Sequence, residues 1–282
     1  MPWIVKLRKR SNIKGKGNRM RISSVQMNMR FACPEDNFGH AEELFARAAE
    51  EKPDTVLFPE TWNTGFFPHE NLKSHCDVDG ERTKELFGRL SKKYKINIVG
   101  GSVANIKNGR VYNTSYIFNR NGECVGEYDK THLFTPMDEH KFFENGDRLV
   151  SFELDGKMCG IIICYDLRFP ELTRTLTTKQ RLDHLFVVSQ WPDKRIFQYQ
   201  TLLCARAIEN QMFVSSCNSC GTAGDTVYGG SSVIYSPLGE TLAKAGTDEE
   251  IITADCNETE LEEIRSSINV FNDRRQMLYF NN

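Results

Sequence analysis

The sequence has no long hydrophobic run. None of its 282 residues belong to a stretch near the ~18 uninterrupted apolar residues that a membrane span needs. It also lacks the composition of a disordered or collagen-like chain, because 26% of its residues are charged, with 20 glycines and 9 prolines. A formal net charge of −2 gives no support to nucleic-acid binding. We therefore expect a globular protein with neither a membrane nor a nucleic acid as partner.

Acidic residues are missing from the first 19 positions, which hold seven lysines and arginines. The rest of the chain has 29 basic and 38 acidic residues, a formal charge of about −9. The near-neutral total is thus an average over two unlike pieces. We expect residues 1–19 to form a flexible basic extension and residues 20–282 to form one domain.

The sequence predicts neither a signal peptide nor a disulfide framework. The apolar residues Trp3–Val5 are too few and precede the basic run, which reverses the expected order. The nine cysteines are odd in number and mostly scattered, which favours a reducing cytoplasm. Cys217 and Cys220 have C-x-x-C spacing, but no second pair supplies four zinc ligands. We expect this pair to mark a strand that runs into a loop.

Short apolar segments alternate with longer amphipathic ones along the chain. The expected strands are 21–27, 55–58, 96–99, 159–163, 185–188, 211–217, 229–236, 241–245 and 250–255. The expected helices are 34–51, 80–95, 170–178, 193–210 and one near 257–267. Hairpins are expected over 111–128, turning at Asn121-Gly122, and around Asp155-Gly156. The pattern predicts a layered α/β domain without repeats or linkers.

Three reactive side chains stand where an expected strand ends. Glu60 follows Val56-Leu57, Lys130 follows the strand of the first hairpin, and Cys164 follows Ile161–Ile163. Singly, these residues are typical of a solvated glutamate, a surface lysine and a core cysteine. Because ligand sites in open α/β sheets gather beyond the carboxyl ends of strands, we expect the three to meet at one edge.

The segments around these residues resemble the nitrilase superfamily of carbon–nitrogen hydrolases over about residues 20–280. The matching motifs are Phe58-Pro59-Glu60, Asp129-Lys130-x-His132-Leu133-Phe134 and Cys164-Tyr165-Asp166-x-Arg168-Phe169-Pro170-Glu171. The ω-amidase branch is the most similar, on Met137–His140, Gln190–Pro192 with Arg195, and Ala205–Gln211. The resemblance implies a four-layer α-β-β-α sandwich, a homodimer and no cofactor or metal. It also implies hydrolysis of the terminal amide of a 2-oxoacid such as 2-oxoglutaramate, with release of ammonia.

The same resemblance assigns roles within the motifs. Glu60 is the implied general base, Lys130 the electrostatic stabiliser and Cys164 the nucleophile, while Glu139 matches a second glutamate. The chemistry requires such a set, because a thiol of pKa ~8.5 is scarcely ionised near neutrality and needs a base. The backbone N–H of Tyr165 is a further expected donor to the oxyanion.

The substrate's remote carboxylate needs a cation, and Arg195 is our leading candidate because a guanidinium pairs with a carboxylate through two hydrogen bonds. A solvated arginine on the expected helix explains it equally well. Trp191 is either a wall of the pocket or a core or interface residue. Arg168 is expected to be a structural partner of a nearby acid.

Other interpretations stay open. Nitrile or N-carbamyl hydrolysis would use the same three residues, and a papain-like enzyme would pair Cys164 with His132 or His140. A silent binding protein on this scaffold is a further alternative, against which the intact Glu60, Lys130 and Cys164 argue. The apolar segment 268–271, with Tyr279 and Phe280, is suited either to a partner subunit or to intramolecular packing.

Overall fold

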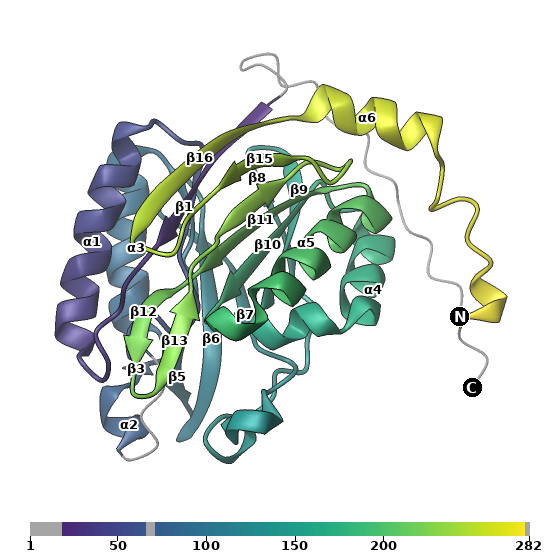
Figure 1. Cartoon of the computed structure of the whole chain (residues 1–282). Coiled ribbons are helices and arrows are strands. Elements are labelled where there is room, and N and C mark those ends of the chain that lie inside the picture. The colour runs from purple at the N-terminus through teal and green to yellow at the C-terminus, as the bar shows by residue number, and fades with distance from the viewer. Residues whose placement is uncertain (1–18, 66–70, 280–282) are drawn as a thin grey trace.

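The computed structural model describes residues 19–65 and 71–279 (Figure 1). All but the last residue of the expected basic extension lies outside this part. Arg19 already belongs to strand β1 (Arg19–Gln26), which starts before the expected Arg21. The reason is a partner along its whole length, because β1 pairs antiparallel with β16 (Glu250–Asn257) from Arg19 opposite Asn257 onward.

Two mixed sheets form the centre of the described chain. The first has eight strands there, in the order β16, β1, β2 (Thr55–Leu57), β4 (Asn97–Val99), β6 (Arg110–Phe118), β5 (Val103–Lys107) and β3 (Asp77–Val78), with β7 (Cys124–Asp129) also paired to β6. The second has six, in the order β15 (Thr241–Lys244), β14 (Val233–Tyr235), β11 (Phe213–Asn218), β10 (His184–Ser189), β9 (Lys157–Ile163) and β8 (Ser151–Leu154). The expected alternation of strands and helices is thus confirmed.

Helices cover the outer face of each sheet (Figure 1). Helices α1 (Pro34–Glu50) and α3 (Glu81–Tyr94) contact the first sheet, and α4 (Pro170–Gln180) and α5 (Ile196–Asn210) contact the second. Helix α1 begins on a proline and buries Ala41, Leu44, Phe45 and Ala48, the spacing that predicted it. The chain is therefore the expected four-layer α-β-β-α sandwich.

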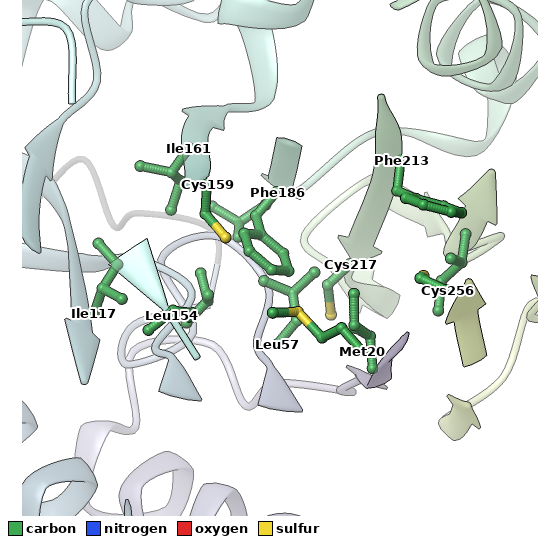
Figure 2. Close-up of a cluster of buried hydrophobic side chains, with 14 of the residues drawn as sticks. Met20, Leu57, Ile117, Leu154, Cys159, Ile161, Phe186, Phe213, Cys217 and Cys256 are labelled. Carbon is green, nitrogen blue, oxygen red and sulfur yellow. The ribbon is translucent and has the colours of Figure 1, made fainter. Parts of the chain in front are cut away.

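Three apolar layers hold the sandwich together. One lies between α1, α3 and the first sheet, one between the two sheets, and one between the second sheet and α4 and α5. Figure 2 shows the middle layer, where Leu57 and Met20 of the first sheet lie beside Phe186 and Cys217 of the second. Cys217 also donates its thiol to the carbonyl of Val25 at 3.0 Å, which links the sheets directly.

Both expected hairpins are confirmed, because β6 pairs antiparallel with β7 and β8 pairs antiparallel with β9. The turn at Asp155-Gly156 joins β8 to β9, and both residues have positive φ, as a type I′ turn requires. The prediction of a loop after Cys217 was wrong. After β11 ends at Asn218, a further hairpin follows, made of β12 (Cys220–Ala223) and β13 (Thr226–Gly229). Its small and polar residues lack the apolar pattern of a strand, whereas its two-residue turn Gly224-Asp225 is a usable signal.

Shorter elements complete the chain. Helix α6 (Glu258–Ser267) follows β16, as expected, and its Leu261 is buried in the layer between the sheets. The strands β3 and β5 and the one-turn helix α2 (Leu72–His75) were missed.

Candidate active site

The carboxyl ends of strands from both sheets meet at one cavity. Glu60 lies just beyond β2, and Lys130 directly follows β7, both of the first sheet. Cys164 directly follows β9 of the second sheet. All three line the same cavity, together with Glu139. The structure thus brings together the four residues that the sequence motifs singled out.

The ammonium of Lys130 lies between two carboxylates. Its Nζ is 2.8 Å from Oε1 of Glu60 and 2.9 and 2.8 Å from the two carboxylate oxygens of Glu139. Burial opposes the charge on Lys130, but the carboxylates of Glu139 and Glu60 hold its pKa well above the usual value. Burial, and then the charge of Glu60, raises the pKa of Glu139 against the opposing effect of Lys130. Lys130 is therefore a fixed positive charge inside the protein.

Cys164 opens a short 3-10 turn that runs to Arg168. Its φ is +46°, in the left-handed region that residues other than glycine rarely adopt. Burial, followed by the negative charge of Glu60, raises the pKa of its thiol well above its usual value. The resting group is thus a neutral thiol that lines the same cavity as the carboxylate of Glu60.

Glu60 is held at both carboxylate oxygens. Its Oε2 accepts the backbone N–H of Gln190 at 2.8 Å, and its Oε1 accepts the side-chain amide of Asn113 at 2.9 Å. The Gln190 side chain donates to the carbonyl of Glu60 at 2.8 Å and to the hydroxyl of Thr61 at 2.7 Å. The sequence reasoning missed Asn113. In the sequence it is only one of the three consecutive polar residues Asn113–Ser115 within β6.

A third carboxylate, that of Asp166, ties the two halves of the site together. Asp166, which is fully buried, accepts hydrogen bonds from Tyr128, Thr131 and His132 around the lysine and from the backbone N–H of Ile163 before the cysteine. The turn at Cys164 is therefore fastened to the segment that carries Lys130. His132 is hydrogen-bonded to Asp166 and His140 is exposed, so neither histidine is placed to act as the base of a papain-like enzyme.

The outer wall of the cavity holds the three residues proposed from sequence to bind substrate, Tyr165, Trp191 and Arg195. Trp191 is buried and donates its indole N–H to the carbonyl of Arg195 at 2.9 Å. The Arg195 guanidinium lies 5.5 Å from the ring centre of Phe134, against which the Tyr165 ring packs edge-on. An aromatic wall with a cation at its edge therefore closes this side.

The expectation that Arg168 pairs with an acid was wrong. Its guanidinium lies 5.0 Å from the ring centre of Trp191 and lines the cavity. Across residues 19–65 and 71–279, no carboxylate forms an ion pair with it. The nearby acid Asp166 is committed to the network described above, which explains the difference. The cavity thus has two arginines at its rim rather than one.

The described residues show neither a cluster suited to a metal ion nor a helix suited to crossing a membrane. Its histidine, cysteine and acidic side chains form no cluster of three or more that could hold a metal ion. Cys217 and Cys220 are both buried and unbridged. Among the residues described, no helix combines the length and apolar character that a bilayer crossing requires.

Comparison with known families agrees with this geometry. The family model described as carbon-nitrogen hydrolase matches residues 21–266, nearly the whole chain. The chain belongs to the carbon-nitrogen hydrolase family. Its buried cluster of thiol, lysine and two carboxylates lies within the matched region.

Named relatives and solved structures of similar length support the assignment of this hydrolase. It is 41% identical to the 2-oxoglutaramate amidase of Bacillus subtilis, covering 92% of this chain and 98% of the relative. It is 30% identical to the human omega-amidase NIT2, covering 92% and 96%. The crystal structure of XC1258 from Xanthomonas campestris, a superfamily protein with an arsenic adduct in its active site, superposes with a TM-score of 0.85. The two chains are 29% identical, with coverage of 91% and 97%.

These relatives decide the class of reaction. As a carbon-nitrogen hydrolase with amidase relatives, the chain is an enzyme that hydrolyses the C–N bond of an amide. The interpretation as a silent binding protein is thereby set aside.

Proposed function

We propose that this hydrolase cleaves the terminal amide of small carboxylic acids, with 2-oxoglutaramate as the leading substrate, and releases ammonia. The observation that carries the proposal is that Cys164 and Glu60 line one cavity with the buried ammonium of Lys130, whose Nζ is 2.8 Å from Glu60. The 2-oxoglutaramate amidase at 41% identity supports the choice of substrate. Two arginines at the rim of the cavity suit a substrate that carries a carboxylate.

Acylation of the cysteine is the first half of the proposed reaction. Glu60 accepts the thiol proton as the sulfur of Cys164 attacks the amide carbon, and the C=O π electrons move to oxygen. Lys130 and the backbone N–H of Tyr165 stabilise this oxyanion, and the loss of one such donor typically costs ~3–4 kcal/mol of transition-state stabilisation. Because the Cys164 pKa is raised, attack and proton transfer belong together.

Release of ammonia and hydrolysis of the thioester complete the cycle. The oxyanion collapses, the C–N bond breaks, and Glu60 returns its proton to the departing nitrogen, which leaves as ammonia. An acyl-thioester then remains on Cys164. A water molecule gives a proton to Glu60 as its oxygen attacks the thioester carbon. The resulting oxyanion collapses, the C–S bond breaks, and Glu60 returns the proton to the sulfur, which restores the thiol and releases the carboxylic acid. Glu139 keeps Lys130 charged throughout.

We assign the substrate carboxylate to Arg195. Its guanidinium lines the cavity and, among the described residues, pairs with no carboxylate of the protein. A planar guanidinium binds a carboxylate through two parallel hydrogen bonds and so fixes the distance from the carboxylate to the amide. Arg168 adds a second positive charge, and Trp191 supplies a flat wall between the two ends.

Ammonia release from 2-oxoglutaramate and succinamate tests the proposal. The wild-type enzyme is expected to release ammonia from both compounds, and Cys164→Ala is expected to abolish it. Cys164→Ser serves as the control for a folded cavity, with its thermal unfolding compared with wild type. Turnover of a nitrile or an N-carbamyl amino acid, with rates at background on both amides, would instead assign another activity of the superfamily.

We expect this enzyme to act as a homodimer in the cytoplasm. Phe197 on α5 is 78% exposed, and Ile208 on the same helix and Leu238 beyond it are also exposed, which supports a subunit contact on this face. Ile268 and Tyr279 of the C-terminal segment are exposed as well, and Phe280 lies outside the described residues. Nine free cysteines suit a reducing compartment. A mass near twice 32.4 kDa by light scattering would support the dimer, and a monomeric mass would contradict it.

A further inference from the structure

The hairpin that sequence reasoning missed carries a tyrosine into the cavity. Tyr228 lies on β13, and its side chain is 5% exposed. It lines the cavity together with Glu60 and Cys164. Burial, and then the negative charge of Glu60, raises the pKa of its hydroxyl above the usual value. Tyr228 therefore lies at the reacting end of the site and stays a neutral phenol.

The hairpin is fixed to the segment that orients the base. The backbone of Tyr228 bridges Pro192, and the N–H of Gly229 donates to the carbonyl of Trp191 at 3.1 Å. The side chain of Asn218 accepts the N–H of Trp191 at 2.6 Å and donates to its carbonyl at 3.1 Å. Trp191 directly follows Gln190, whose N–H holds Glu60. Tyr228 thus has a defined position relative to the base.

A primary amide bound in this cavity needs one more hydrogen-bond acceptor besides Glu60. Its oxygen faces Lys130 and a backbone N–H, and one of its two N–H groups faces Glu60, which must return a proton to that nitrogen. The second N–H requires an acceptor. Lysine and arginine can only donate, and each oxygen of Glu139 already accepts two hydrogen bonds, Oε1 from Lys130 and Asn113 and Oε2 from Lys130 and the N–H of Phe134. A phenol oxygen accepts an N–H even while its own proton is donated elsewhere.

We propose that the hydroxyl of Tyr228 binds the second N–H of the scissile amide and orients the nitrogen for departure as ammonia. Tyr228 is then a specificity residue for primary amides, because an ester of the same acid has no N–H to offer. This inference rests on the proposed amidase function. It predicts that removing the hydroxyl lowers amide turnover selectively.

The experiment compares two substrates that differ only in the leaving group, succinamate and monomethyl succinate. For Tyr228→Phe, we expect kcat/KM on succinamate to fall by about tenfold or more, and kcat/KM on the ester to stay within about threefold of wild type. Tyr116→Phe is the matched control. It also removes a buried phenol hydroxyl, one that accepts from Asn105 at 2.9 Å in the layer under α3, and it should leave both rates unchanged.

Each result of the comparison for Tyr228→Phe either supports the proposed role of Tyr228 or overturns it. A selective loss on the amide supports the proposal, whereas an equal loss on both substrates, or no loss on either, overturns it. The rate of Cys164 alkylation by iodoacetamide, with thermal unfolding, checks that the variant keeps its cavity. Wild-type turnover of succinamate tests the proposed function separately. If wild type turns over neither succinamate nor 2-oxoglutaramate, both proposals fail, whereas with succinamate turnover the amide-to-ester ratio decides for Tyr228 alone.

Discussion

Replacing Asp166 with asparagine would test how the two halves of the site are joined. Oδ1 of Asp166 accepts the hydroxyl of Thr131 at 2.9 Å and the backbone N–H and ring Nδ1 of His132 at 2.9 and 2.8 Å. Oδ2 accepts the N–H of Ile163 at 3.0 Å and the hydroxyl of Tyr128 at 2.7 Å. Five donors therefore converge on one buried carboxylate. Asparagine keeps the shape but replaces one acceptor oxygen with an NH₂ group.

The magnitude follows from the donors that lose their acceptor. Whichever way the amide turns, one backbone N–H, of His132 or of Ile163, faces the new NH₂ group and is left buried without a partner. A buried unsatisfied donor costs ~1–3 kcal/mol, and a hydrogen bond to a charged group contributes ~1.5–3 kcal/mol. We expect Asp166→Asn to lower the free energy of unfolding by about 3 kcal/mol. At ~2–4 °C per kcal/mol, the unfolding midpoint should fall by roughly 6–12 °C.

Catalysis should suffer more than stability. Because Asp166 fastens the Cys164 turn to the Lys130 segment, its loss lets the thiol move relative to the lysine, and a misplacement of ~1 Å costs about 100-fold in rate. The assays are calorimetry and ammonia release at a temperature where the variant is folded. Asp147→Asn is the control, since the Asp147 side chain is 92% exposed. A variant at Asp166 with wild-type midpoint and kcat would refute the reasoning.

Two further predictions use other parts of the molecule. Arg195→Ala should raise KM for succinamate by about tenfold while leaving butyramide, which has no carboxylate, unchanged. An equal change in KM for both amides would contradict the assignment of the substrate carboxylate to Arg195. Burial lowers the pKa of His184 to about 4, so below the unfolded value near 6.5 the unfolded chain binds a proton that the folded chain does not. Wild type should thus lose roughly 3 kcal/mol of stability between pH 7 and 4 from this group. His184→Leu should flatten that part of the profile, and an unchanged pH slope would count against the account.

Local sequence patterns predicted the alternating strands and helices and the reactive residues at strand ends, whereas the four-layer arrangement was implied by the family resemblance. The spacing of Ala41, Leu44, Phe45 and Ala48 determines which face of α1 is buried, whatever lies opposite. Reactive residues that follow apolar strands lie at sheet edges for the same local reason. That three such edges come together in one cavity followed from the family resemblance, since strand order is not readable from one sequence.

The residues that the sequence did not assign act through tertiary contacts. Asn113 resembles any polar residue of a strand until β6 is placed beside Glu60. Arg168 was expected to pair with an acid, but Asp166, two residues earlier, is already committed to His132 and its neighbours. Tyr228 was missed because its hairpin is made of small and polar residues, which stay ordered through backbone contacts to the segment at Trp191. Local patterns contain none of this information.

The residues of the active site come from both sheets. Glu60 and Lys130 come from the first sheet, whereas Cys164 and Gln190 come from the second. The backbone N–H of Glu60 even donates to the carbonyl of Ser189, at the end of β10, at 3.4 Å. The distance between base and thiol is therefore set by the apolar layer between the sheets, since close-packed interiors transmit small shifts. Changes in that layer should alter catalysis as well as stability, although no residue of it needs to touch the substrate.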